Sequence, residues 1–164
     1  MANHIVLFEP QNPHNSGNIA RTCAGTNTVL HFILPLGFDM KDKQLKRAGL
    51  DYWESVEIHY HQTFSEFLCE IDTSRLFVVS NQGEEIYSDK NYSETGDYYF
   101  LFGNESGKLP ENSTSANHLC VPMNNTHIEA LNLSNMAALV IFEVLRQQGF
   151  PTMALSYDNE KIER

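Results

Sequence analysis

The stretch ALNLSNMAALVIFEVLRQQG, residues 130–149, joins a polar beginning to an apolar middle. Residues 136–142 are seven apolar residues in a row. Small polar residues cap helix N-termini and glycine often follows the last turn, so we expect a helix that starts at a Ser134 or Asn135 cap and ends at Gly149. A helix that is apolar on every side must be covered on every side. We therefore expect a sheet and a second copy of the chain to pack against it.

Six short apolar runs precede this helix and predict buried strands. They cover residues 4–8, 31–34, 55–60, 75–80, 98–102 and 118–121. Helical patterns lie between them, from Ile19 onward with Ser16 or Asn18 as the cap, and over residues 41–48, 63–71 and 111–116. This alternation predicts an α/β fold with a parallel sheet whose ligands bind at the carboxyl ends of the strands. Loops rich in Gly or Asn follow Phe8, Phe102 and Val121, so three such ends are expected to converge.

The length of 164 residues favours one domain, which we place at residues 1–154, with a short polar tail at 155–164. The first ten residues lack the pattern of a signal peptide, and no apolar run approaches the ~20 residues that cross a bilayer. Cys23, Cys69 and Cys120 are odd in number and far apart, which favours buried thiols over a disulfide or a metal set. We expect a cytoplasmic protein with no membrane segment and no metal.

Several familiar site motifs fail on their spacing. Residues 103–108, GNESGK, place three residues between the glycines where a phosphate-binding P-loop needs four. Ser106 lacks the context of a nucleophile elbow. His59 and His61 have no Cys or carboxylate set nearby and are interpreted as surface histidines. Residues 51–53, DYW, could stack a base, but a packed aromatic corner is the favoured interpretation.

The charge is unevenly distributed. The formal net charge is −10, with 21 acidic and 11 basic residues, which by itself opposes the approach of a polyanion. Four of the 11 basic residues nevertheless fall within seven positions, at Lys41, Lys43, Lys46 and Arg47. They form either a solvated helix face or a patch that contacts phosphates, and the sequence leaves both readings open.

Three separated segments carry a family resemblance. Residues 15–21 (NSGNIAR), residues 102–110 (FGNESGKLP), and residues 121–123 (VPM) with residues 131–135 (LNLSN) strongly resemble the three motifs of the SPOUT methyltransferases, in the family's order. The segment KRAGLD at residues 46–51 resembles the TrmL (YibK) branch of that family. The resemblance covers about residues 4–150.

The resemblance implies a specific fold and function. The family's fold is a parallel sheet flanked by helices with a deep trefoil knot in its C-terminal segment, and the family acts as a homodimer. The branch transfers a methyl group from S-adenosylmethionine to the ribose 2′-hydroxyl of the wobble nucleotide, C or modified U, of leucine tRNAs. The expected RNA partner is therefore the tRNA anticodon stem-loop.

The resemblance also assigns roles to individual residues. The catalytic residue would be Arg21, with Asn15 and Ser134 orienting it. An arginine pKa above ~12 suits it to stabilise the forming alkoxide better than to take up a proton. The expected cofactor contacts are Val79, Gly103, Glu105, Val121, Met123, Ala130 and Leu133. The expected RNA contacts are Lys43, Lys46 and Arg47.

Three positions depart from the family pattern. Lys108 stands where the second motif has a glycine, so we expect it to adopt that glycine's conformation, with a positive φ as one option. Glu129 and Ala130 replace the Arg-Ser pair common before the third motif. Two alternatives therefore stay open: a protein of this family with weakened catalysis that acts as a cofactor- or RNA-binding module, or an enzyme that methylates another RNA. For Arg21 the alternative is an exposed helix cation paired with Glu9.

Overall fold

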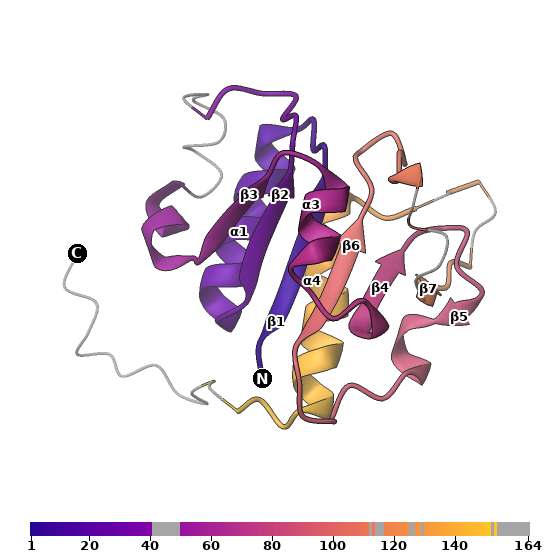
Figure 1. Ribbon diagram of the computed structural model, residues 1–164. Coiled ribbons are helices and arrows are strands. Elements are labelled where there is room, and N and C mark those ends of the chain that lie inside the picture. Colours follow the sequence, from indigo (N-terminus) through magenta and orange to yellow (C-terminus); the bar gives the residue numbers. More distant parts are fainter. Residues whose placement is uncertain are drawn as a thin grey trace.

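The computed structural model describes residues 1–40, 50–111, 113, 117–124, 127–128, 130–151 and 153. Across these residues runs a seven-stranded sheet in the order β3-β2-β1-β6-β4-β7-β5, and every neighbouring pair is parallel (Figure 1). The strands are β1 Asn3–Phe8, β2 Val29–Ile33, β3 Ile58–His61, β4 Leu76–Val79, β5 Glu85–Ile86, β6 Tyr98–Phe102 and β7 Asn117–Cys120. The expected parallel α/β sheet is confirmed, and the two-residue strand β5 is an addition that the sequence did not predict.

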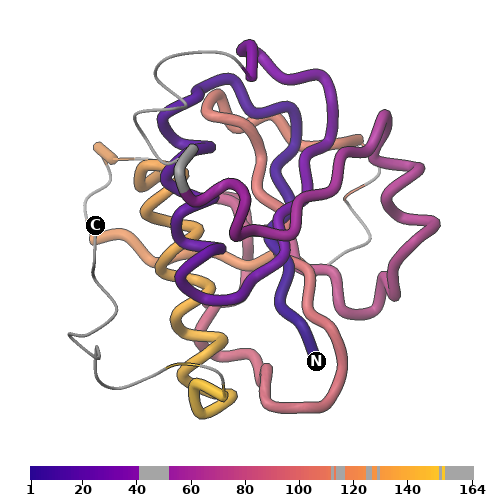
Figure 2. The backbone as a smooth tube through the Cα atoms, turned by 90° about the vertical axis from the view of Figure 1, so that its left-hand side faces the viewer, coloured from indigo at the N-terminus to yellow at the C-terminus, as the bar shows by residue number. Residues whose placement is uncertain are grey.

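Helices cover both faces of the sheet. The helices α1, Pro13–Thr26, and α4, Leu133–Gln147, lie side by side on one face, and the short α3, Phe64–Cys69, covers the other (Figures 1 and 2). Short 3₁₀ helices lie in the connections, among them η1 Leu50–Ser55, η2 Thr73–Arg75 and η3 Tyr87–Asp89.

Successive residues of the central strands pack into two different cores. Ile5 and Leu7 of β1 belong to the core under α1 and α4, while Val6 and Phe8 belong to the core under α3. Side chains alternate between the faces of a strand, so a strand buried on both faces is a continuous apolar run. This explains why β1 and β6 were clear in the sequence.

Both long helices begin at different caps than the sequence predicted. In α1 the cap is Asn12, whose side chain accepts from the backbone N–H of His14 and Asn15, so the helix begins at Pro13 and not near Ile19. Proline fits the first turn of a helix, where its missing N–H is not needed. In α4 the cap is Asn132, so the helix begins before the expected caps Ser134 and Asn135.

Two further interpretations are wrong. His61 is buried, with 3% of its surface exposed, because β2 and α3 cover the face of β3 that carries it. Cys69 is exposed, because the buried side of α3 consists of Phe64 and Phe67. Cys23 is buried as expected, and burial raises the pKa of its thiol to about 12.

Some expectations are not settled by these residues. No helix in the described part of the chain is long and apolar enough to cross a membrane. The described residues also contain no cluster of three or more His, Cys, Asp or Glu suited to a metal ion. The helix expected at 41–48 and the tail at 155–164 lie outside the described residues, and the knot stays a prediction.

Candidate active site

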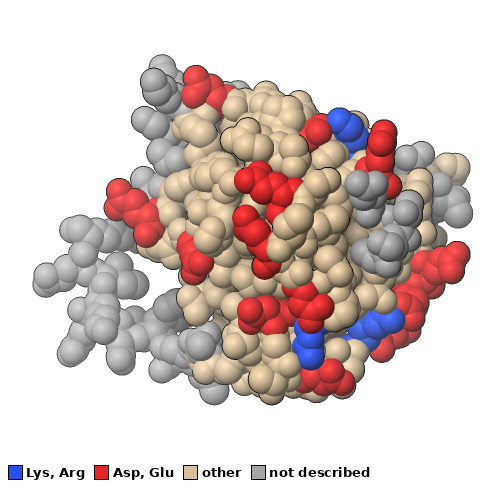
Figure 3. All heavy atoms as spheres, in the orientation of Figure 1, with Lys and Arg blue, Asp and Glu red and all other residues tan. Residues whose placement is uncertain are grey.

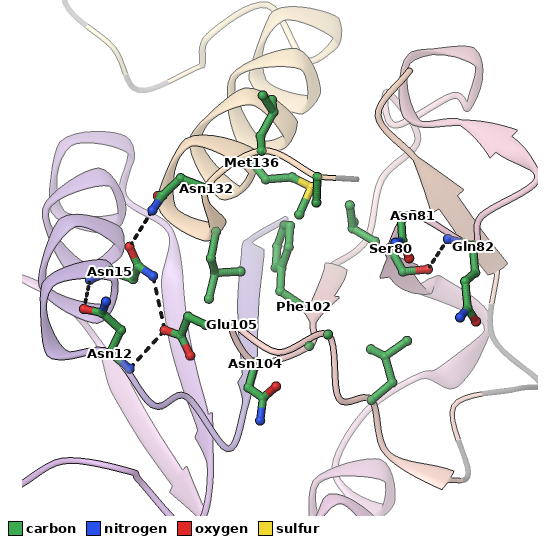
Figure 4. Close-up of a pocket in the computed structure, with 17 residues that line it drawn as sticks. Asn12, Asn15, Ser80, Asn81, Gln82, Phe102, Asn104, Glu105, Asn132 and Met136 are labelled. Carbon is green, nitrogen blue, oxygen red and sulfur yellow. Dashed lines mark hydrogen bonds between the residues drawn. The ribbon is translucent and has the colours of Figure 1, made fainter. Parts of the chain in front are cut away.

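A cavity of about 370 Å³ opens at the carboxyl ends of β4 and β6, beside the start of α4 (Figure 4). This volume lies within the range of about 300–1,000 Å³ typical of small-molecule sites. The carboxyl edge of a parallel sheet is where such folds bind ligands. The lining comes from four segments: Asn12 and Asn15, residues 79–82, residues 102–105 with Gly107 and Leu109, and residues 130–133 with Met136.

All seven residues predicted to contact a cofactor lie around this space. Val79, Gly103, Glu105, Ala130 and Leu133 line the main cavity. Val121 and Met123 line a smaller one that shares Ser80, Asn81, Ala130, Leu131 and Met136 with it. Residues far apart in the chain are thus brought together as expected, while their role as cofactor contacts stays a prediction.

The carboxylate of Glu105 binds the beginning of α1. It accepts from the backbone N–H of Gln11 at 2.8 Å and of Asn12 at 3.1 Å, and from Asn15 Nδ2 at 3.2 Å. The positive end of a helix dipole favours a negative charge here. Glu105 therefore joins the loop after β6 to the first turn of α1 (Figure 4).

A chain of amides continues from Asn15 to α4. Asn15 Oδ1 accepts from Asn132 Nδ2 at 3.0 Å, and Asn132 Oδ1 accepts from the backbone N–H of Ser134 at 2.9 Å and from its hydroxyl at 2.7 Å. These bonds fix both amide orientations, since each oxygen accepts and each Nδ2 donates. The predicted catalytic residues Asn15 and Ser134 are thus connected through Asn132.

The loop of residues 103–108 keeps its shape through its own contacts. Asn104 Oδ1 accepts from the backbone N–H of Ser106 and Lys108 and from the Ser106 hydroxyl. At Gly103 a Cβ atom would lie 2.7 Å from the Lys108 carbonyl oxygen, so only glycine fits there. Gly107 takes the left-handed conformation, with φ +79°, which leaves Lys108 with an ordinary negative φ. The expected strain at Lys108 is absent because its glycine neighbour carries the turn.

Arg21 lies apart from this cavity. It is six residues beyond Asn15 on α1, or about 9 Å along the helix axis. Its Nη2 donates to the Tyr52 hydroxyl at 2.9 Å, and its guanidinium carbon lies 4.7 Å from the centroid of the Tyr52 ring. The alternative that paired Arg21 with Glu9 is wrong, because Glu9 binds Lys108.

The described basic side chains differ in their partners. Four of the five pair with carboxylates: Arg75 with Glu94, Lys90 with Glu85, Lys108 with Glu9, and Arg146 with Glu143. The fifth is Arg21, which contacts a hydroxyl and a ring. Acidic side chains also outnumber basic ones on the face of the molecule that carries α3 (Figure 3). Arg21 is thus the described cation best placed to serve an anionic group.

Sequence reasoning missed one side of the cavity. Ser80, Asn81 and Gln82 line it directly after β4, but the sequence suggested only a turn there. A polar loop that follows a buried strand was the available signal. Lys43, Lys46, Arg47 and Glu129 lie outside the described residues.

Comparison with known proteins decides the family. Residues 2–142 match the model of the SpoU rRNA Methylase family. The chain belongs to this family. It is 49% identical over 164 residues to a relative from Lactococcus lactis, covering 97% of both chains, that is provisionally named a tRNA (cytidine(34)-2′-O)-methyltransferase. It is 42% identical over 151 residues to a Saccharophagus degradans protein of the same name, covering 90% of this chain and 96% of that one.

Solved structures agree with this SpoU-family assignment. A structure described as an RNA methyltransferase of Bacillus anthracis, by provisional assignment, gives a TM-score of 0.85 at 45% identity and covers 95% of this chain and 100% of its own. A structure from a study of the 2-OH methylation of C/U34 on tRNA gives 0.83 at 37% identity, with coverages of 90% and 97%. The family predicted from the three motifs is confirmed, and so is the parallel sheet flanked by helices, while the knot stays a prediction.

Proposed function

We propose that this SpoU-family chain transfers a methyl group from S-adenosylmethionine to the ribose 2′-hydroxyl of the wobble nucleotide, position 34, of tRNA. The observation that carries the proposal is that residues of all three sequence motifs line two adjoining cavities, in a chain whose near-full-length relatives are named for cytidine 34. Leucine tRNAs with C or modified U at this position are the proposed substrates. A tRNA substrate in turn favours a cytoplasmic protein.

The cavity suits S-adenosylmethionine in size and lining. The lining includes the apolar residues Val79, Phe102 and Leu133 and the amide side chains Asn81 and Gln82, a combination that suits an adenosine and an amino-acid moiety. The cofactor supplies an activated methyl group: the C–O bond forms as the S–C bond breaks, and the bonding pair stays on sulfur. The hydroxyl proton passes to solvent, so the protein mainly positions the reactants.

Arg21 is the residue proposed to stabilise negative charge on the 2′-oxygen during this reaction. Its permanent positive charge stabilises the oxygen as the proton leaves and attracts the neighbouring phosphate. Asn15, held by Glu105 and Asn132, fixes the first turns of the helix that carries Arg21. Lys43, Lys46 and Arg47 are proposed to extend this positive region along the RNA.

A second copy of the chain is proposed to complete the molecule. Leu139 and Phe142 of α4 are 37% and 45% exposed, whereas the apolar residues Val140, Ile141, Val144 and Leu145 of the same helix are buried. Asn135, Leu139, Phe142 and Arg146 form an exposed stripe with alternating spacings of four and three residues. Such spacing lets two helices pack along a common seam. The homodimer would cover this apolar surface.

The test is methyl transfer in vitro. The full-length chain is incubated with methyl-labelled S-adenosylmethionine and total bacterial tRNA, and the wobble nucleoside is identified by mass spectrometry after digestion. We expect a 2′-O-methyl group at position 34, and at least about 100-fold less transfer by Arg21→Ala. Lys90→Ala, which removes an ion-paired cation at the far edge of the sheet, serves as the control.

Three outcomes would contradict the proposal or part of it. Label in ribosomal RNA and none in tRNA would indicate another substrate. Cofactor binding in calorimetry without transfer to any RNA would indicate a binding module. Full activity of Arg21→Ala would refute the role of that residue.

A further inference from the structure

Tyr52 is the residue that holds the Arg21 side chain. Arg21 Nη2 donates to the Tyr52 hydroxyl at 2.9 Å, and the guanidinium lies over the face of the ring, 4.7 Å from its centroid. The two residues come from different elements, α1 and η1, and are 31 positions apart in the sequence. The contact is therefore made by the fold and not by local sequence.

The element that carries Tyr52 is anchored in the core. Trp53, the next residue of η1, stacks on the fully buried Phe32 of β2, with ring centroids 5.9 Å apart and planes at 17°. The favoured interpretation of residues 51–53 as a packed aromatic corner thus applies to Trp53. Tyr52 is half-exposed instead, with its hydroxyl directed at Arg21.

The chemistry of this partner distinguishes Arg21 from the other described cations. A carboxylate would orient a guanidinium but would also neutralise it, as Glu143 does for Arg146. A phenol hydroxyl and an aromatic face orient the guanidinium while its full charge remains. One of the five N–H donors is used by Tyr52, which leaves others for an oxygen of the substrate.

We infer that Tyr52 is a positioning residue that orients Arg21 for the substrate's 2′-oxygen or phosphate without neutralising its charge. This inference rests on the proposed function, because it assigns Arg21 to the methyl transfer. It extends that function by a residue that none of the three family motifs contains.

The kinetic test separates orientation from charge. Tyr52→Phe keeps the ring and removes the acceptor, so we expect kcat to fall about 10-fold while the KM for S-adenosylmethionine stays within twofold. Tyr52→Glu restores an acceptor but neutralises the guanidinium, and we expect activity as low as that of Arg21→Ala. In the Arg21→Ala background, Tyr52→Phe should cause no further loss. Tyr87→Phe, at a partly buried tyrosine of η3 beside the edge strand β5, is the matched control, because β5 lies at the opposite edge of the sheet from η1 and β3.

A second measurement tests the contact without activity. The NMR signals of the Arg21 guanidinium should show restricted motion in the wild-type protein and clearly faster motion in Tyr52→Phe, which keeps the ring but loses the hydrogen bond. Unchanged guanidinium motion would overturn the inference, as would a Tyr52→Phe loss that persists in the Arg21→Ala background. If the wild-type chain methylates no RNA, the proposed function fails, and the NMR result still decides whether Tyr52 positions Arg21.

Discussion

Glu105 has a structural role in addition to the cofactor contact that its motif implied. It was predicted as a cofactor contact, and it does line the cavity, but its carboxylate is engaged by three N–H donors of residues 11, 12 and 15. A carboxylate that receives several N–H groups at a helix start stabilises that start. Glu105 is therefore expected to act on the site through the position of α1.

Replacing Glu105 by glutamine tests whether its carboxylate stabilises the start of α1. Glu105→Gln leaves one acceptor oxygen and turns an Nε2 donor toward backbone N–H groups, so the free energy of unfolding should fall by about 1–3 kcal/mol. Urea denaturation measures it. Glu111→Gln removes the same charge from an exposed position and is the control. Equal losses of unfolding free energy in the two variants would mean that the change in net charge, and not the contacts of Glu105, determines the effect.

Alanine is expected to have opposite effects on the free energy of unfolding at two glycines, Gly103 and Gly25. Gly103→Ala brings a Cβ to 2.7 Å from the Lys108 carbonyl oxygen, so the loop beside the cavity must move. Gly25 lies within α1, and a Cβ there meets no atom within 4 Å. We expect Gly25→Ala to raise the free energy of unfolding by up to about 1 kcal/mol. Gly103→Ala should lower it and weaken S-adenosylmethionine binding in calorimetry, and a neutral result would contradict the close approach.

At the scale of the elements, the sequence predicted the helix caps and strands that depend only on neighbouring residues. The α3 cap at Thr63 and the strand β6 follow from a few neighbouring residues, and both are present. The start of α1 was misplaced because Asn15 and Ser16 look like loop residues, whereas the fold buries both. The partners of Asn15, Glu105 and Asn132, are 90 and 117 positions away, so no local pattern could indicate them.

The candidate site was predictable to the extent that motifs exist for it. The residues that the resemblance picked out on three loops line two adjoining cavities, while their roles as cofactor contacts stay predictions. Ser80–Gln82 were not predicted to line the cavity, because a turn after a strand has the same sequence pattern whether or not it binds a ligand. The role of Tyr52 could not be predicted from the sequence, because its contact with Arg21 arises only when η1 packs beside α1.

A row of histidines crosses three strands on the α3 side of the sheet. His4 Nδ1 lies 2.9 Å from His31 Nε2, and His31 Nδ1 lies 3.0 Å from His61 Nε2. His61 Nδ1 lies 3.7 Å from a Glu70 carboxylate oxygen, and His4 Nε2 is buried without a partner. An unpartnered acceptor costs less than an unpartnered N–H, so we assign a proton to each Nδ1, directed toward Glu70.

This row predicts a loss of stability in acid. Burial, followed by the neighbouring His4, His59 and His61, lowers the pKa of His31 to about 3. The unfolded chain, with a His pKa near 6.5, binds this proton first, so the stabilisation present above pH 6.5 is lost as the pH falls from there toward 3. His31 alone should lower the free energy of unfolding by about 2 kcal/mol between pH 7 and 5.

Urea denaturation at a series of pH values checks the expectation. The pKa values of His4 and His61 are lowered mainly by burial, against the nearby carboxylates of Asp97 and Glu70 respectively, and add to the same trend. His31→Leu should reduce the number of protons taken up on unfolding by about one, so the decline of stability with falling pH should become less steep. A constant free energy of unfolding from pH 7 to 5 would contradict the buried neutral row.

At the scale of the whole molecule, the distribution of charge concerns RNA binding, and the exposed apolar surface concerns dimer formation. A net charge of −10 opposes RNA in general, so binding must concentrate where cations gather, at Arg21 and the basic segment of residues 41–47. Such an RNA complex should weaken with added salt in proportion to the number of phosphates it contacts, so few contacts predict a shallow salt dependence.

The exposed stripe of α4, whose apolar members are Leu139 and Phe142, is the surface that we propose contacts a second copy of the chain. Phe142 sits in the middle of that stripe with 45% of its surface exposed, which a dimer would bury. Phe142→Glu would place a buried, unpaired charge in each half of a two-fold interface, so we expect it to convert dimers into monomers of 18.7 kDa. Sedimentation velocity distinguishes the two. Ile86→Glu, a similarly exposed apolar position on the edge strand β5, should leave the dimer intact. If Phe142→Glu sediments like the wild-type protein, the homodimer does not use this face of α4.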